Sequence, residues 1–120
     1  MTLGRWLLPT AIVATAAVVA LSLGNAPQLP GGLFDFEGAD KLKHCLAYGT
    51  LGVLWAGWLS PKRAAQAGLL LAALFALGAL LEVLQWAFYP DRYFEFADML
   101  ANGVGAVLGI LLARRIFPSL

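Results

Sequence analysis

Charged residues are scarce in this sequence: they make up 12% of its 120 residues, whereas hydrophobic residues make up 61%. This balance lies well outside the usual range of soluble domains, so it argues against a water-soluble protein. The formal net charge is +1 and the 8 Lys and Arg residues are scattered, so the chain lacks the basic face that a nucleic acid needs. The single cysteine, Cys45, excludes an intramolecular disulfide and leaves no Cys/His pattern for a structural zinc site.

The sequence contains four long apolar runs. Each is long enough to cross a bilayer core of about 30 Å as a helix of about 20 residues. The runs do not alternate between polar and apolar residues and are rich in Leu and Ala, so they are expected to be helices. The predicted spans cover residues 6–23, 41–59, 64–89 and 96–113. We therefore predict an all-α, integral membrane four-helix bundle that forms a single membrane domain.

Charge is distributed unevenly between the two ends of these spans. Lys and Arg outnumber acids at one set of ends, and acids concentrate at the other. Because loops rich in Lys and Arg stay in the cytoplasm, both termini are predicted to be cytoplasmic. The basic residues at the inner ends are Arg5, Lys62, Arg63, Arg114 and Arg115, and the outer acids are Asp35, Glu37, Asp40, Asp91, Glu95 and Asp98.

The first span has an alternative interpretation as a cleaved secretory signal. Arg5 precedes an apolar run that ends in Gly24-Asn25-Ala26, a pattern that resembles a cleavage site. The run is long for such a signal, and Pro27 would follow the scissile bond, where cleavage is poorly tolerated. A retained span is therefore the prediction.

Two segments that enter spans from the outer side resemble each other. When residues 36–44 are aligned with residues 94–102 without gaps, Phe, Glu, Ala, Asp and Leu occupy matching positions. This match suggests a parallel two-helix internal repeat, related by an axis along the membrane normal. Convergence is the alternative, because an aromatic residue followed by an Asp N-cap suits any helix that begins at the headgroup level.

Polar residues gather near the outer ends of the last three spans. Asp40, His44 and Tyr48 are spaced by four and so share one face of the second helix. Glu82 lies inside the third span, where a carboxylate costs a few kcal/mol. We expect it to face the bundle interior and either to have a partner, His44 or Arg92, or else to be protonated.

The fourth helix carries a stripe of polar and small residues. Asp98 and Asn102 stand above Gly105 and Gly109 on one face. Such a stripe is typical of a helix whose lower half packs closely against a neighbour while its upper half offers ligands.

These positions define a candidate site. Two purely structural interpretations remain open: Asp40 and Asp98 could be helix N-caps, and Gln85 and Asn102 could form hydrogen bonds between helices. No cofactor or set of metal ligands is assigned, although the ligand types allow a divalent metal. The candidate catalytic residues are His44, Glu82 and Asp98, and the candidate substrate-binding residues are Asp40, Lys41, Tyr48, Gln85, Arg92 and Asn102.

The order and spacing of these motifs resemble those of a known family. The motifs are Asp40-Lys41-x-x-His44 with Tyr48, Glu82-x-x-Gln85, Arg92 and Asp98-x-x-x-Asn102-Gly103-x-Gly105. Together they are similar to the VanZ-like family of small bacterial membrane proteins, over residues 40–109 or so. The family is named after a protein associated with resistance to the glycopeptide teicoplanin. The resemblance implies a cell-envelope role in the bacterial inner membrane but brings no established reaction.

Three functions are compatible with these features. The protein could bind or act on a lipid-linked or anionic envelope molecule, with Lys41, Lys43 and Arg92 holding its headgroup and His44 as general acid or base. It could be a subunit of a lipid flippase or transporter, which would require a homo-oligomer because four helices hardly enclose a path. It could also be a non-catalytic accessory protein of an envelope enzyme. The sequence leaves open whether the protein is an enzyme.

Overall fold

The computed structural model describes residues 4–24, 38–89 and 95–117. Within these ranges the chain forms four α-helices and no strand: α1 (Gly4–Leu23), α2 (Ala39–Leu59), α3 (Ala64–Phe88) and α4 (Phe96–Ile116). The prediction of an all-α four-helix bundle is therefore confirmed. Each helix begins and ends within three residues of an expected span.

Residues that suit turns set the ends of α2. Gly38 precedes the helix with a φ of 83°, a left-handed conformation that glycine adopts without steric cost. Ser60 ends the helix with a φ of 48°, and Pro61 follows it. Since proline cannot continue a helix without losing a backbone hydrogen bond, α2 and α3 are separate helices joined by a short connection.

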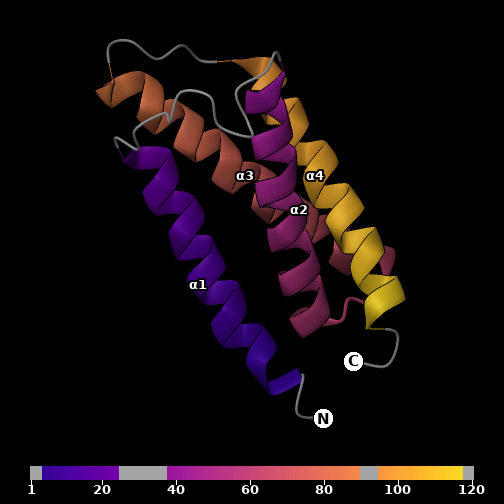
Figure 1. Cartoon of the computed structure of the whole chain (residues 1–120). Coiled ribbons are helices and arrows are strands. Elements are labelled where there is room, and N and C mark those ends of the chain that lie inside the picture. The colour runs from indigo at the N-terminus through magenta and orange to yellow at the C-terminus, as the bar shows by residue number, and fades with distance from the viewer. Residues whose placement is uncertain (1–3, 25–37, 90–94, 118–120) are drawn as a thin grey trace.

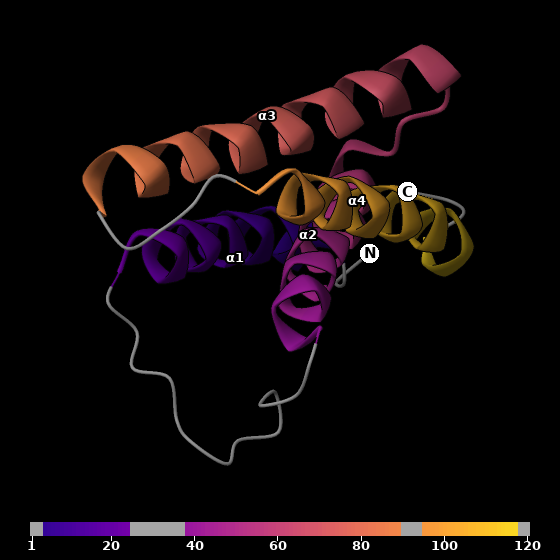
Figure 2. The ribbon, with the colours of Figure 1, turned by 90° about the horizontal axis from the view of Figure 1, so that it is seen from above.

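Successive helices run in opposite directions (Figure 1). The residues around Leu23, Ala39, Phe88 and Phe96 lie at the upper end in this view, and both ends of the described chain lie at the lower end. Seen from above, α3 lies along one side of the bundle, and its Phe88 end comes beside the Leu23 end of α1 (Figure 2). The upper end of α3 thus covers α1, while its lower part runs beside α4.

The interface between α2 and α4 is the closest in the bundle. A methyl group added at Gly105 would lie 2.9 Å from the Cα atom of Cys45, and one added at Gly109 would meet the backbone of Gly49. Only glycine therefore allows the two backbones to approach this closely. The prediction that the lower half of the fourth helix packs backbone to backbone is confirmed.

Hydrogen bonds attach α1 to the rest of the bundle. The indole Nε1 of Trp55 donates to the hydroxyl oxygen of Thr15 at 2.9 Å, which joins α2 to α1. At the upper end, the Tyr89 hydroxyl donates to the backbone oxygen of Leu23. These bonds position α1 as an outer helix against α2 and α3.

The surface of the bundle suits a lipid environment. By length and composition, α1, α3 and α4 could each cross a membrane, with mean hydropathies of 2.0, 2.3 and 1.8. Helix α2 is not among these candidates; it carries Lys41, Lys43 and His44 near its start and contacts all three other helices. Large side chains such as Phe88 and Leu69 are exposed on the surface. Such exposure indicates a membrane protein.

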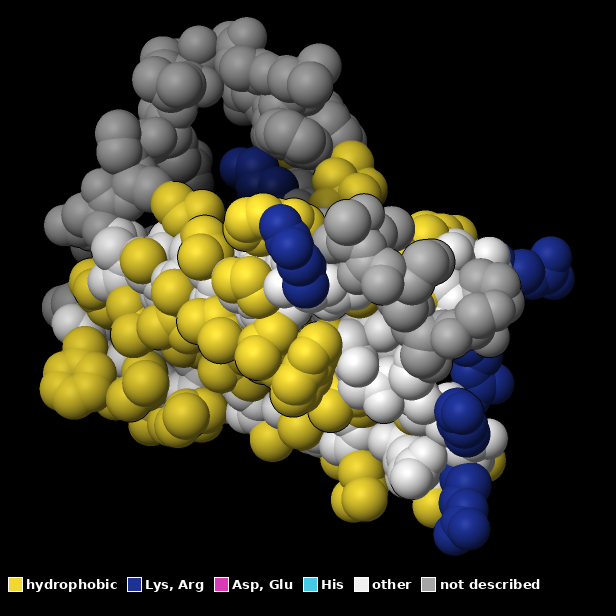
Figure 3. Space-filling model, turned by 90° about the horizontal axis from the view of Figure 1, so that it is seen from below, with side chains coloured by type: hydrophobic (Ala, Val, Ile, Leu, Met, Phe, Trp, Pro, Cys, Tyr) yellow, Lys and Arg dark blue, Asp and Glu magenta, His cyan; other side chains and the backbone are white. Residues whose placement is uncertain are grey.

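The two ends of the bundle differ in charge. Arg114 and Arg115 lie in the last turn of α4, at the lower end. Viewed from below, Lys and Arg side chains project at the edge of a broad hydrophobic surface (Figure 3). The acids Asp40 and Asp98 lie in the first turns of α2 and α4, at the upper end. The side of the membrane that each end faces stays a prediction from this asymmetry.

The helix directions agree with those that the internal repeat requires. Helices α1 and α3 run the same way, as do α2 and α4 (Figure 1). Matching positions of the two similar segments also meet, because His44 and Asn102 are hydrogen-bonded across the interface. The repeat itself remains a prediction.

Candidate functional site

Polar side chains from three helices meet at the upper end of the bundle. Glu82 of α3 and Asp98 and Asn102 of α4 are 3%, 7% and 2% exposed. His44 of α2 contacts two of them. We call this group the outer cluster; it consists of Asp40, Lys41, His44, Glu82, Glu95, Asp98 and Asn102.

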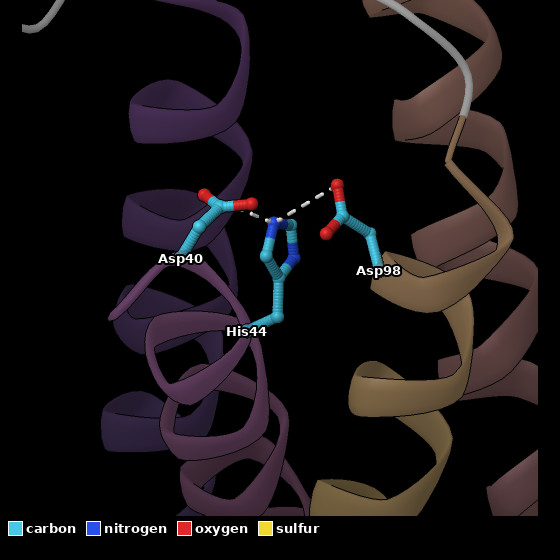
Figure 4. A group of neighbouring side chains, drawn as sticks. All are labelled: Asp40, His44 and Asp98. Carbon is cyan, nitrogen blue, oxygen red and sulfur yellow. Dashed lines mark ion pairs between the residues drawn. The ribbon is translucent and has the colours of Figure 1, made fainter. Parts of the chain in front are cut away.

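The orientation of His44 is fixed by Asn102. The two side chains are joined by a hydrogen bond of 2.9 Å between the imidazole Nδ1 and the amide oxygen. Since an amide oxygen can only accept, Nδ1 carries the proton. The other ring nitrogen, Nε2, therefore faces Asp98 Oδ2 at 3.6 Å and Asp40 Oδ1 at 3.8 Å (Figure 4).

Three carboxylates surround Lys41. Its Nζ atom lies 2.5 Å from Glu95 Oε2, 2.6 Å from Asp98 Oδ1 and 3.3 Å from Asp40 Oδ2. Each aspartate therefore directs one oxygen to Lys41 and the other to His44. By formal charge, the three carboxylates exceed the single lysine by two negative charges, so Lys41 gives this end no surplus of positive charge.

Replacing Lys41 with methionine is expected to destabilise the protein. Methionine keeps the apolar stem of the side chain but leaves the buried Asp98 without its cation, at a cost of about 1–3 kcal/mol because Lys41 is partly exposed. Thermal unfolding in detergent measures the change, with Lys62→Met at the lower end as the control. Equal stability of the two variants would show that the ion pairs contribute nothing.

Asp40 and Asp98 are not N-caps. Gly38 and Glu95 occupy those positions, and neither forms a side-chain cap bond.

The pKa of Asp40, which lies just before the predicted span, is set by opposing effects. Partial burial of the carboxylate disfavours its charged form and by itself would raise the pKa. The opposing effects of His44 and of contacts from Asp98 and Lys41 are larger and hold the pKa of Asp40 below its usual value.

Glu82 meets α4 rather than a cation. Its side chain contacts the side chain of Asp98 and accepts a hydrogen bond from the backbone of Glu95. Of the two expected partners, His44 is hydrogen-bonded to Asn102 instead, and Arg92 lies outside the described residues. The cation that contacts this pair of acids is Lys41, whose Nζ atom lies 2.6 Å from Asp98 Oδ1.

The other two candidate residues that the structure describes differ in their relation to the outer cluster. Tyr48 is 3% exposed and borders the cluster, because its ring and the side-chain amide of Asn102 both lie against Gly78 of α3. The Nε2 atom of Gln85 donates to the backbone oxygen of Ser22 at 2.6 Å, so its contact is with α1. For Gln85, the interpretation as a hydrogen bond between helices therefore describes the structure.

Glu95 belongs to the cluster but was not among the candidates. The signal was present in the similarity of the two segments, since Glu95 precedes Asp98 by three residues just before the helix begins.

The cluster offers proton-accepting and ligand atoms at one place. Atoms from Asp40, His44 and Asp98 that could bind a metal ion lie within 4.8 Å of one another. Neutral His44 can accept a proton or a metal ion only at Nε2, because Nδ1 is already protonated. The arrangement therefore allows general base chemistry or cation binding.

Comparison with known proteins identifies the family. The model of the VanZ/LLP1 family matches residues 6–117, a range that includes most of α1 and the whole of α2, α3 and α4. No curated protein and no solved structure matches the chain. Because the match covers nearly the whole sequence, the chain belongs to the VanZ/LLP1 family.

Proposed function

We propose that this protein binds a lipid-linked envelope molecule at the outer face of the bacterial inner membrane. The headgroup would lie at the outer cluster, and the hydrocarbon chain would lie along the bundle. The observation that carries this proposal is that buried polar residues from three helices adjoin an apolar groove. Membership of the VanZ/LLP1 family supports an envelope role, and the charge asymmetry of the bundle supports the outer location.

The groove lies between α3 and α4. It has a volume of about 570 Å³ and is lined by apolar side chains and glycines from residues 68–75 of α3 and 100–108 of α4. A space of this size is typical of small-molecule sites. Leu100 and Gly103 line its α4 side, and Gly103 is the neighbour of Asn102 in the outer cluster. The groove therefore reaches the same height along α4 as the outer cluster, which supports the proposal that one lipid occupies both places.

The packing below the cluster favours binding at one face over transport by a single copy. Leu51 of α2 and Ala106 of α4 are completely buried in the hydrophobic core. The glycines of α4 bring the backbones of α2 and α4 together along the same stretch. Below the outer cluster, the described part of one chain is thus filled by apolar side chains and closely packed backbone, which supports binding at one face.

Filling the groove is expected to weaken lipid binding. The probe is farnesyl phosphate, which combines an apolar chain with a phosphate. Ala72 lines the groove, so Ala72→Trp is expected to lower the affinity by about tenfold or more. Isothermal titration calorimetry on the purified protein in detergent measures this change.

Ala73→Trp is the matched control, because it adds the same side chain one residue along, about 100° around the helix. It is expected to bind farnesyl phosphate like the wild type. If both tryptophan variants bind equally well, the chain does not occupy the groove.

A further inference from the structure

We propose that Asp40, His44 and Asp98 bind a divalent transition-metal cation, and that this cation receives the phosphate of the bound lipid. The second half of the inference rests on the proposed function. The first half, cation binding, stands on the geometry of the outer cluster alone.

The three ligand atoms are spaced for one ion rather than for hydrogen bonds. His44 Nε2 lies 3.6 Å from Asp98 Oδ2 and 3.8 Å from Asp40 Oδ1. These distances are long for hydrogen bonds, which need about 2.7–3.2 Å. In a tetrahedral zinc site with bonds of about 2.0–2.1 Å, neighbouring ligand atoms lie about 3.3 Å apart. All three atoms lie within 4.8 Å of one another, so an inward movement of the side chains would bring them to the spacing of ligands around one ion (Figure 4).

The surrounding contacts orient each ligand. Asn102 accepts from His44 Nδ1, which leaves the lone pair of Nε2 directed at the two aspartates. Histidines that bind metals typically make such a hydrogen bond through the other ring nitrogen. Lys41 holds the second oxygen of both Asp40 and Asp98, so their remaining oxygens face His44. A second layer of contacts is therefore already in place.

The net negative charge of the outer cluster also favours the binding of a cation. Lys41 leaves two negative charges unbalanced among Asp40, Glu95 and Asp98, and Glu82 adds a further acidic group against Asp98. Asp98 is only 7% exposed and is paired with Lys41 through Oδ1, so Oδ2 is the oxygen that faces His44 and is left for a further cation. A phosphate would be repelled by this cluster unless a cation stood between them. The cation thus reconciles an acidic site with an anionic ligand.

The ligand types select the kind of metal. One imidazole nitrogen and two carboxylate oxygens suit zinc and neighbouring first-row metals, whereas calcium prefers six to eight oxygen atoms. Three protein ligands leave at least one position for water or phosphate. Because the Asp40 side chain is 65% exposed, this position would be reached from the outer side.

Zinc binding without lipid tests the first half. The full chain, purified in detergent and stripped with EDTA, is titrated with zinc, and with cobalt to record the absorption bands of the bound ion. The wild type is expected to bind one zinc ion per chain. His44→Ala is expected to lose the site, and Asn102→Ala to weaken it by about 10–100-fold. Thr50→Ala is the control, because the exposed Thr50 hydroxyl donates to the backbone oxygen of Leu46 in its own helix; this variant is expected to bind zinc like the wild type.

Circular dichroism and gel filtration show whether each variant remains folded. If the His44 variant does not fold, the Asn102 comparison and the cobalt spectrum of the wild type decide the question. A wild type that binds neither metal would overturn the site, and so would a folded His44→Ala that binds zinc with wild-type affinity.

Farnesyl phosphate tests the second half, with farnesol as the probe that lacks phosphate. Zinc is expected to raise the affinity for farnesyl phosphate by about tenfold or more and to leave farnesol unchanged. Equal binding of farnesyl phosphate in zinc and in EDTA would overturn the cation's role while supporting the proposed function. Zinc binding with no binding of farnesyl phosphate would overturn the proposed function while supporting the metal site.

Discussion

Replacing Glu82 with alanine is expected to weaken binding of farnesyl phosphate strongly while the protein stays in the membrane. Glu82 is 3% exposed, contacts the side chain of Asp98 and accepts a hydrogen bond from the backbone of Glu95. It therefore holds the first turn of α4 against α3. Without it, Asp98 loses its position, and we expect the affinity to fall by about a hundredfold, which corresponds to about 2.7 kcal/mol. Calorimetry on the purified variant measures this loss.

Two further variants make this result interpretable. Val83→Ala changes the next residue of α3, which is 44% exposed, and is expected to bind normally. Glu82→Gln keeps a hydrogen-bonding side chain but removes the charge, and is expected to bind more weakly than the wild type and better than Glu82→Ala. Wild-type affinity in Glu82→Ala would remove Glu82 from the site. Absence of that variant from the membrane fraction would instead show a purely structural role.

Gly109→Leu is expected to destabilise the whole bundle. A Cβ atom at this position would meet the backbone of Gly49, which no side-chain movement can relieve. The clash is expected to cost about 3 kcal/mol or more and to push α2 away from α4. Because His44 and Asn102 meet across the same interface, the outer cluster should open as well. Thermal unfolding and zinc binding record the two effects separately.

Gly68→Leu provides the matched control for stability. A Cβ atom added at Gly68 would meet no heavy atom within 4 Å, so the same substitution is expected to leave the unfolding temperature unchanged or slightly raised. If Gly109→Leu were as stable as Gly68→Leu, the close approach of α2 and α4 would not be what holds the bundle together.

The sequence contains enough information to predict the helices and the packing face of α4. The length of the apolar runs determines where helices form, because each must satisfy its own backbone hydrogen bonds. The stripe from Asp98 through Asn102 to Gly105 and Gly109 follows the helical period, and all four residues are buried in the structure. A pattern that depends on one helix alone can therefore be read directly from its residues.

Contacts that depend on how helices cross could not be predicted in the same way. Gln85 lies three residues after Glu82, a spacing that brings two residues near one face of a helix, yet the obliquely placed upper end of α3 brings Gln85 to Ser22 of α1. Glu95 precedes α4, so no helical period indicates its direction. The long side chain of Lys41 could have reached either the lipid headgroups or the carboxylates of the outer cluster. Only the tertiary structure distinguishes these two positions of the side chain.

A crystal structure of the protein grown in lipid with zinc and farnesyl phosphate would test the central claim most directly. We expect the phosphate beside His44 Nε2 and Asp98, and the farnesyl chain in the groove between α3 and α4. A phosphate bound elsewhere, with His44, Glu82 and Asp98 closed off by their own side chains, would contradict the assignment of the outer cluster as the binding site.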